Sequence, residues 1–243
     1  MKQTVTPYKD GDAKKNQVSK MFNQIAERYD LLNRLTSFGI DIIWRKRAIA
    51  SLDKSKHHKI LDVATGTADV ALEIKHQIPQ VEHITGLDIS SEMLAVGREK
   101  VAKKGWTEKI TLVEGDSEDL PFEDNSFDAV TVAFGVRNFE NLAKGLKEIH
   151  RVLRPGGKLV VLEFSHPTAF PIKQLFNFYF KNILPAIGGV ISKDKSAYQY
   201  LYDSVQAFLD QKAFVQQLND LGYKSNQCKS LTFGVCSLYT GYK

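Results

Sequence analysis

The sequence is poor in cysteine and lacks any long apolar run. Its only two cysteines among 243 residues, Cys228 and Cys236, have neither the spacing nor the histidine partners of a zinc site. No apolar stretch is long enough to span a bilayer, and the amino end is polar and lysine-rich, unlike a secretory signal. These absences predict a cytoplasmic protein without a metal site, whose cysteines are reduced, half-buried strand residues.

The composition is otherwise that of an ordinary globular protein. Hydrophobic residues make up 43% and charged residues 25% of the chain, which is enough for one substantial core. The net charge of +5 permits binding to phosphate, nucleic acid or an anionic membrane, but it selects none of them. Residues 1–13 are polar without periodicity and are predicted to be flexible, so we expect a single domain over residues 14–243.

Strand-like and helix-like segments alternate through most of this domain. Such alternation predicts an α/β fold with a doubly wound, mostly parallel sheet and right-handed crossovers. Two strand-like runs near the C-terminus are joined by a short segment, so we expect seven strands with antiparallel pairing at one edge. The turn at 154–157, RPGG, is expected to end the helix before it. The expected strands are 59–63, 83–87, 109–113, 127–133, 158–164, 223–228 and 235–242, and the expected helices are 69–77, 91–104 and 142–153.

Two segments depart from this repeat. Residues 14–55 begin as an amphipathic helix, and the polar and small residues Asn33, Thr36, Ser37 and Gly39 are expected to break it into a helical cover over the sheet. Residues 168–209 contain an aromatic-rich block from Phe170 to Ile187, which Gly188 and Gly189 end. A buried core helix would explain this block, and so would a hydrophobic substrate channel or a membrane-facing patch.

The stretch ILDVATGTADV at 60–70 predicts a strand, a tight turn around Gly66 and a helix. In an open parallel sheet, the loops at the carboxyl ends of the strands form the binding crevice. A helix that begins there also presents unpaired N–H groups and the positive end of its dipole. We therefore expect a ligand at this turn, with Gly66 and Thr67 beside it.

Three carboxylates follow successive strands of the expected sheet: Asp62, Asp88 and Asp116. Asp88 lies about 20 residues after the glycine turn, where a carboxylate can accept hydrogen bonds from both hydroxyls of a ribose in NAD or S-adenosylmethionine. Carboxylates would repel the pyrophosphate of NAD, whereas S-adenosylmethionine carries sulfonium and ammonium groups. The pattern therefore predicts S-adenosylmethionine, with Asp116 on the adenine amino group and the Ser117 N–H on a ring nitrogen.

Several motifs carry a resemblance to known families. ILDVATGTAD, GLDIS, GDSEDLPFEDNSFDAV and RVLRPGGKLVVLEF resemble the Rossmann-like class I S-adenosylmethionine-dependent methyltransferases. More narrowly, YDLLNRLTSFGIDIIW, FGVRN and LEFSHP resemble the UbiE/MenG/Coq5 family, over residues 19–243. Cofactor contacts at Thr67, Asp88, Asp116 and Ser117 follow from this resemblance. Ala68 departs from the pattern, because many methyltransferases have a glycine there, and alanine suits the position if its φ is negative.

The resemblance implies C-methylation of a prenylated naphthoquinol, which converts demethylmenaquinol to menaquinol. A quinol ring carbon becomes a nucleophile once an adjacent hydroxyl is ionised. Keeping a phenol-like hydroxyl with a pKa of about 10 ionised near pH 7 takes roughly 4 kcal/mol. Arg137, which stays protonated, is expected to supply this stabilisation electrostatically, and Asn138 and Tyr29 are expected to position the hydroxyl.

Other functions are compatible with parts of this pattern. The enzyme could also methylate a benzoquinol, another small molecule or RNA, and a protein that binds S-adenosylmethionine without turnover would show the same cofactor residues. The aromatic residues cluster with aliphatic ones rather than along a basic groove, which argues against nucleic acid. We therefore expect a quinol as partner, with transient contact at the cytoplasmic face of the membrane, and an oligomer remains compatible with the sequence.

Overall fold

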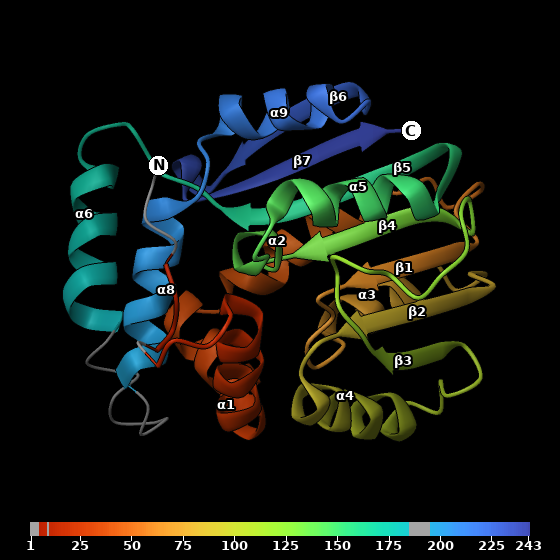
Figure 1. Ribbon diagram of the computed structural model, residues 1–243, viewed down its shortest axis with the longest axis horizontal. Helices are drawn as coiled ribbons and strands as arrows, with labels where there is room; N and C mark the ends of the chain where they lie inside the picture. The colour runs from red at the N-terminus through yellow and green to blue at the C-terminus, as the bar shows by residue number, and fades with distance from the viewer. Residues whose placement is uncertain (1–4, 9, 185–194) are drawn as a thin grey trace.

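The computed structural model describes residues 5–8, 10–184 and 195–243. Within these ranges the strands form a seven-stranded sheet in the order β3-β2-β1-β4-β5-β7-β6 (Figure 1). Strands β1 to β5 are parallel, and β7 lies antiparallel between β5 and β6. The predicted doubly wound, mostly parallel sheet with an antiparallel C-terminal strand is confirmed. The strands are β1 Lys59–Val63, β2 His83–Asp88, β3 Ile110–Glu114, β4 Phe127–Ala133, β5 Leu153–Phe164, β6 Lys224–Leu231 and β7 Cys236–Tyr242.

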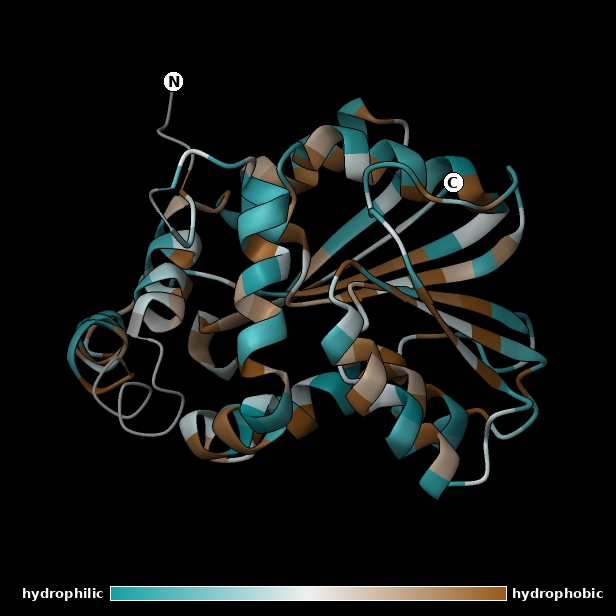
Figure 2. Ribbon diagram, turned by 60° about the horizontal axis from the view of Figure 1, so that its bottom comes forward, coloured by the Kyte–Doolittle hydropathy of each residue, from teal (hydrophilic) through white to brown (hydrophobic). Residues whose placement is uncertain are grey.

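Helices cover both faces of the sheet, because the central strands β1, β4 and β5 are buried on both sides over most of their length. Apolar residues concentrate on the central strands, while the helices mix apolar and polar positions (Figure 2). One face packs against α2, α3 and α4, and the other packs against α5 and α9. The helices on these two faces are α2 Ile40–Ile49, α3 Asp69–Gln77, α4 Ser91–Lys103, α5 Leu142–Val152 and α9 Gln211–Asp220.

A third apolar cluster lies beyond the carboxyl ends of the parallel strands. It is formed by α1 Lys14–Ser37, α6 Ile172–Phe178, the π-helical turn η2 Tyr179–Ile183 and α8 Lys195–Ala207. Figure 1 shows α1, α6 and α8 at this end of the sheet. Because the strand order reverses between β1 and β4, the binding crevice of such a sheet opens towards this cluster.

The predicted break that separates two helices in this cover is confirmed at Ser37 and Gly39, but not at Asn33 and Thr36. Helix α1 continues through both residues and ends at Phe38 and Gly39, which have φ angles of 51° and 75°. The Thr36 hydroxyl donates to the carbonyl of Leu32, 2.8 Å away, so this polar side chain is satisfied inside the helix. The helical cover therefore consists of one long helix and a short second one.

The predicted end of the helix before 154–157 is confirmed, but the predicted turn there is wrong. Helix α5 ends at Val152, but residues 153–157 belong to β5 rather than to a separate turn. Leu153 pairs with Phe127, and Lys158 pairs with Ala129. Between these two pairs, β5 therefore contains more residues than β4. The RPGG sequence therefore forms a bulge within the strand, where glycine tolerates the required backbone angles.

The aromatic block serves both as core and as surface. Phe176 and Phe180 are buried in the third cluster, whereas Phe170, Leu175 and Phe178 are exposed. The predicted end of the block, at Ile187, Gly188 and Gly189, lies outside the described residues. Across the described residues, no helix is long and apolar enough to cross a membrane.

Both cysteines are free, as predicted, but they differ in burial. Cys228 is half-buried, whereas Cys236 is fully buried in the core rather than half-buried.

Candidate active site

The turn after β1 combines three left-handed residues with a buried carboxylate. Ala64, Gly66 and Ala68 have φ angles of 54°, 55° and 65°. The condition under which alanine would suit position 68, a negative φ, is therefore not met. A non-glycine residue in this region costs about 1–2 kcal/mol, so the turn stores strain at the point where the sequence predicts a ligand.

Asp62 lies beneath this turn rather than on the wall of a cavity. Its side chain is 1% exposed. The Thr65 and Thr131 hydroxyls each donate to it at 2.6 Å. Burial raises the pKa of Asp62 to about 7, although both hydroxyl contacts act in the opposite direction. The geometry favours a role in holding the turn over direct contact with a cofactor.

Asp88, Asp116 and Ser117 line a narrow cavity of about 80 Å³ beside the turn. Asp88 accepts hydrogen bonds from the N–H groups of Gly66 at 2.8 Å and of Ser90 at 2.9 Å, and burial raises its pKa. Asp116 accepts from the Glu118 N–H at 2.8 Å. The structure thus brings together the carboxylates that the sequence assigns to a nucleoside.

Helix α1 crosses the loops that follow β1, β2 and β3, and makes polar contacts with each. Lys15 Nζ lies 3.1 Å from Asp116, and the Ser19 hydroxyl donates to the Ile89 carbonyl at 3.1 Å. Nearer the end of α1, Asp30 accepts a hydrogen bond of 2.6 Å from Thr67. The predicted ligand residue Thr67 is therefore held by α1, a contact that the sequence did not indicate.

A larger cavity of about 430 Å³ adjoins the narrow one. Its walls come from α1, α2, α6, η2 and α8, from the loops after β1 and β4, from the end of β5 and from residues 232–235. Most of its lining residues are apolar or aromatic. Six residues line both cavities and so mark where the two spaces meet: Phe22, Tyr29, Ala64, Gly66, Ala133 and Phe134.

Arg137 is the buried cation on the wall of the larger cavity. It belongs to the 3-10 turn η1 Val136–Asn138, and its side chain is 8% exposed. Nη1 lies 2.8 Å from a carboxylate oxygen of Glu163, which is fully buried on β5. Burial raises the pKa of Glu163, and Arg137 opposes that shift. Among the described residues, none accepts a hydrogen bond from the buried Nε of Arg137.

Glu163 is the residue that sequence reasoning missed. The signal was present, because a single carboxylate stands within the otherwise apolar strand KLVVLEF at 158–164. A carboxylate in such a run needs a buried partner. Arg137, four residues after the end of β4, supplies that partner because β4 and β5 are neighbours in the sheet.

Tyr29 and Asn138, the two residues predicted to position the substrate hydroxyl, line different parts of the two cavities. Burial raises the pKa of Tyr29, so its hydroxyl stays protonated and can donate a hydrogen bond. The Tyr200 hydroxyl donates to Asn138 Oδ1 at 3.1 Å, so the Asn138 side chain is already oriented by α8. Tyr29 lines both cavities, whereas Asn138 lines only the narrow one.

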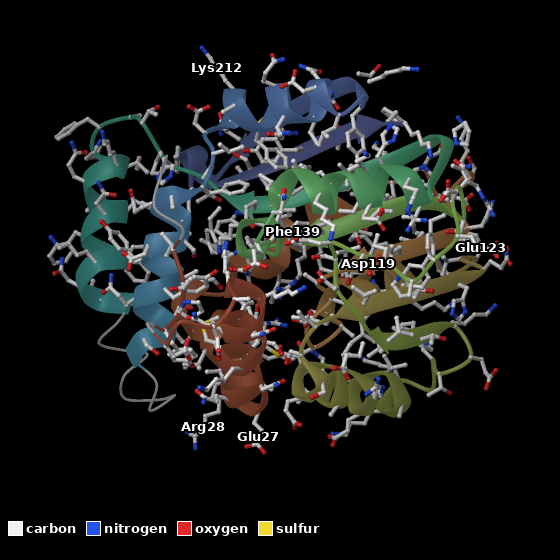
Figure 3. The ribbon with its side chains drawn as sticks, viewed as in Figure 1. Glu27, Arg28, Asp119, Glu123, Phe139 and Lys212 are labelled. Carbon is white, nitrogen blue, oxygen red and sulfur yellow. The ribbon has the colours of Figure 1, made fainter. Side chains whose placement is uncertain are left out.

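The start of α1 fixes the loop that carries Arg137. Lys14 Nζ donates to the carbonyls of Arg137 at 3.0 Å and of Phe139 at 2.9 Å. Burial, with a contribution from Arg137, lowers the pKa of Lys14 to about 8. Figure 3 shows Phe139 near the middle of the molecule, between α1 and the sheet.

Within the described residues, no cluster of three or more His, Cys, Asp or Glu side chains is suited to a metal ion.

Comparison with known proteins gives one family and one fold. A model of the ubiE/COQ5 methyltransferase family matches residues 10–243. A Bacteroides fragilis protein named demethylmenaquinone methyltransferase is 47% identical over 98% of this chain and 97% of its own length. A Geotalea daltonii protein named ubiquinone/menaquinone biosynthesis C-methyltransferase UbiE is 47% identical over 95% of this chain and 97% of its own.

A solved structure from Thermotoga maritima shows the same fold. It is described as an S-adenosylmethionine-dependent methyltransferase, possibly a histamine N-methyltransferase, and it superposes with a TM-score of 0.64. The match covers 93% of this chain and 99% of the other, at 15% identity. At this identity the likeness shows the class I methyltransferase fold alone.

The close approach of Gly135 to the turn predicts a coupled pair of substitutions. A Cβ atom at Gly135 would lie 2.5 Å from the Ala64 Cβ. Gly135→Ala should therefore destabilise the protein by about 1–3 kcal/mol. Ala64→Gly removes the clashing atom and the left-handed strain together, so we expect the double variant to recover about 1 kcal/mol or more. Urea unfolding of all four proteins measures this coupling, and strictly additive effects would contradict it.

The buried carboxyl of Asp62 predicts a pH dependence of stability. With a pKa of about 7, the folded protein keeps a proton that the unfolded chain, at a value of 3.8, gives up. Stability should therefore fall as the pH rises between these two values and then level off. We expect the wild type to lose about 2 kcal/mol more than Asp62→Asn between pH 5 and pH 7. Urea unfolding at several pH values tests this, and parallel profiles for the two proteins would refute it.

Proposed function

The chain belongs to the ubiE/COQ5 methyltransferase family, and we propose on this premise that it transfers a methyl group from S-adenosylmethionine to a ring carbon of a prenylated demethylmenaquinol. One observation carries the proposal. A narrow cavity lined by carboxylates adjoins an apolar cavity with a buried arginine, and the two meet at Tyr29, Ala64 and Phe134. Relatives named demethylmenaquinone methyltransferase support the choice of substrate.

The narrow cavity suits the cofactor. Asp88 is held by backbone N–H groups, and its carboxylate keeps lone pairs for the two ribose hydroxyls. Asp116 and the Ser117 N–H are suited to the edge of an adenine ring. The Thr67 N–H, just before α3, is suited to the carboxylate of the methionine part, whereas the Gly66 N–H is already engaged by Asp88. When bound, S-adenosylmethionine supplies an electrophilic methyl group.

The larger cavity suits the quinol. Its aromatic walls exclude water from the ring, and Arg137 lies on its wall with Nη1 bound to Glu163. Because Glu163 compensates much of the arginine charge at 2.8 Å, Arg137 acts on the ionised hydroxyl through directed hydrogen bonds more than through a full unit charge. The Tyr29 hydroxyl, which stays protonated, supplies a further donor beside the reacting ring.

The transfer forms one carbon–carbon bond and breaks one carbon–sulfur bond. It leaves S-adenosylhomocysteine and releases one proton, for which water is the acceptor. The prenyl tail requires an apolar path, and the part of the cavity between Phe176 and Phe180 on one side and α1 on the other provides it. Such a tail partitions into lipid, so we expect the reaction at the cytoplasmic face of a membrane.

Transfer of labelled methyl from S-adenosylmethionine tests the proposal. We expect label on demethylmenaquinol in detergent and none on oxidised demethylmenaquinone, because the quinone has no ionisable hydroxyl. A demethylated benzoquinol and bulk RNA are assayed beside them. Label on both quinols would extend the reaction to the ubiquinone type, whereas label on RNA, or on nothing despite cofactor binding, would contradict the proposal.

The buried ion pair predicts a separation of stability from activity. Arg137→Gln leaves the Glu163 carboxylate buried without its cation, which should cost about 3–5 kcal/mol of stability. In Arg137→Gln/Glu163→Gln, two neutral amides replace the pair, so we expect much of that stability to return. The rate of methyl transfer should stay lower by about 10²-fold or more in both variants, because the donors to the ionised hydroxyl are lost.

Unfolding free energies and single-turnover rates of the two variants measure this separation. A double variant that regained both stability and activity would show that the pair is structural only. Glu163→Gln alone serves as the matched single variant, since it keeps Arg137 but removes the compensating charge.

A further inference from the structure

Among the described residues, nine large apolar side chains are exposed, and three of them lie at the mouth of the larger cavity. Phe38, Leu175 and Phe233 line the cavity and are exposed at the same time. They come from three separate segments: the corner between α1 and α2, helix α6, and the turn η3 Thr232–Gly234. The remaining exposed residues are Leu31, Leu35, Ile43, Phe170, Phe178 and Ile183. We call these nine residues the rim.

The backbone at two rim residues is strained. Phe38 has a φ of 51° and Phe233 a φ of 56°, which is the left-handed region that bulky side chains rarely adopt. Their side chains are 80% and 78% exposed, so burial within this chain does not repay the strain. Backbone strain that is not compensated by buried side-chain contacts is typical of functional sites. Here it turns two phenylalanines outward beside the cavity mouth.

Helical spacing places the other rim residues on the same surfaces. Leu31, Leu35 and Phe38 are separated by four and three positions, so they form one stripe at the end of α1. Leu175 and Phe178 form a second stripe on α6. Phe38 also lies against Tyr179, with ring centroids 6.4 Å apart, which joins the two stripes.

On α2 and between α6 and η2 the charges beside the rim are positive, whereas on α1 the exposed Glu27 lies one turn before Leu31. The segment from Ile172 to Ile183 carries two exposed lysines, Lys173 and Lys181, and no acidic residue. On α2, Lys46 and Arg47 follow Ile43 by three and four positions and share its exposed side. An apolar surface flanked by lysine and arginine fits the headgroup region of an anionic bilayer.

We propose that the rim is a docking surface for an anionic lipid bilayer, which sets the cavity mouth against the hydrocarbon. This inference rests on the proposed function, because a prenylated quinol dissolved in the bilayer would then enter the cavity without crossing water. A lipid surface is favoured over a protein partner because the rim is continuous with the apolar cavity that receives the tail. The outward phenylalanines anchor the surface, and the flanking cations supply the attraction.

Flotation of the full chain with vesicles tests the docking. The probe is vesicles of phosphatidylglycerol and phosphatidylethanolamine in equal parts, with phosphatidylcholine vesicles as the neutral comparison. We expect stronger binding to the anionic vesicles, and Phe38→Ser/Phe233→Ser should lower the partition coefficient at least about tenfold. Phe38→Leu/Phe233→Leu keeps the apolar surface and should retain binding. Equal flotation of the wild type and the serine variant would overturn the inference.

A matched pair of charge variants separates docking from net charge. Lys173→Glu/Lys181→Glu and Lys212→Glu/Lys224→Glu change the net charge equally. Lys212 lies on α9 and points away from α1 and α6 (Figure 3), and Lys224 begins β6. Only the first pair should lose binding, by about tenfold or more. Equal losses in both variants would mean a nonspecific charge effect and would overturn the assignment of this surface.

Activity distinguishes failure of docking from failure of the proposed function. Lys173→Glu/Lys181→Glu should lose methyl transfer to a quinol carried in vesicles, while transfer to a short-tailed quinol in solution is retained. A wild-type protein that methylates the soluble quinol but does not float would overturn the docking and leave the proposed function standing.

Sedimentation without lipid provides a further check. A dimer that Phe38→Ser/Phe233→Ser dissociates would make the rim an interface between two copies and would overturn the docking.

Discussion

The hydrogen bond between Thr67 and Asp30 joins the turn after β1 to helix α1, and both cavities depend on that junction. Lys100 binds the same pair, with Nζ 2.7 Å from Asp30 and 3.2 Å from Thr67, so a charged group reinforces the contact. At the other end of α1, Lys15 forms an ion pair with Asp116 in the loop after β3. One helix thus lines both the narrow cavity and the larger one. A displacement of α1 would open both spaces together.

The sequence predicted the parts of this arrangement that follow from local pattern. The strands, the turn at Gly66 and the carboxylates Asp88 and Asp116 were found because a parallel sheet brings successive strand ends to one edge. The sequence does not predict that α1 continues through Asn33 and Thr36, because both are weak helix formers. Contacts with residues distant in the sequence compensate for their low helix propensity. The Tyr179 hydroxyl, for example, donates to the carbonyl of Thr36 at 2.6 Å. The helix propensity of a residue does not include a hydrogen bond from a side chain so distant in the sequence.

The roles of individual side chains were harder to predict than their positions. Asp62 follows the same pattern as Asp88, yet two threonine hydroxyls hold it beneath the turn. Whether a carboxylate faces a ligand or the scaffold depends on the direction of one side chain, which alternates along a strand and changes at a turn. The positive φ at Ala68 likewise depends on the geometry of the whole turn. The folded geometry determines both details, because neither follows from the residue type alone.

The buried pair of Arg137 and Glu163 shows why the reacting cavity differs from an ordinary core. Two apolar side chains of similar volume would often stabilise a fold as well as a buried ion pair or better, because removing both charges from water is costly. The pair also leaves the Arg137 Nε without an acceptor among the described residues, a further cost. These costs are explained if the guanidinium acts on a ligand. A neutral quinone offers it only weak acceptors, whereas an ionised quinol offers a charged oxygen that strengthens each hydrogen bond. In the proposed reaction, this pair favours the reduced, reactive form of the substrate.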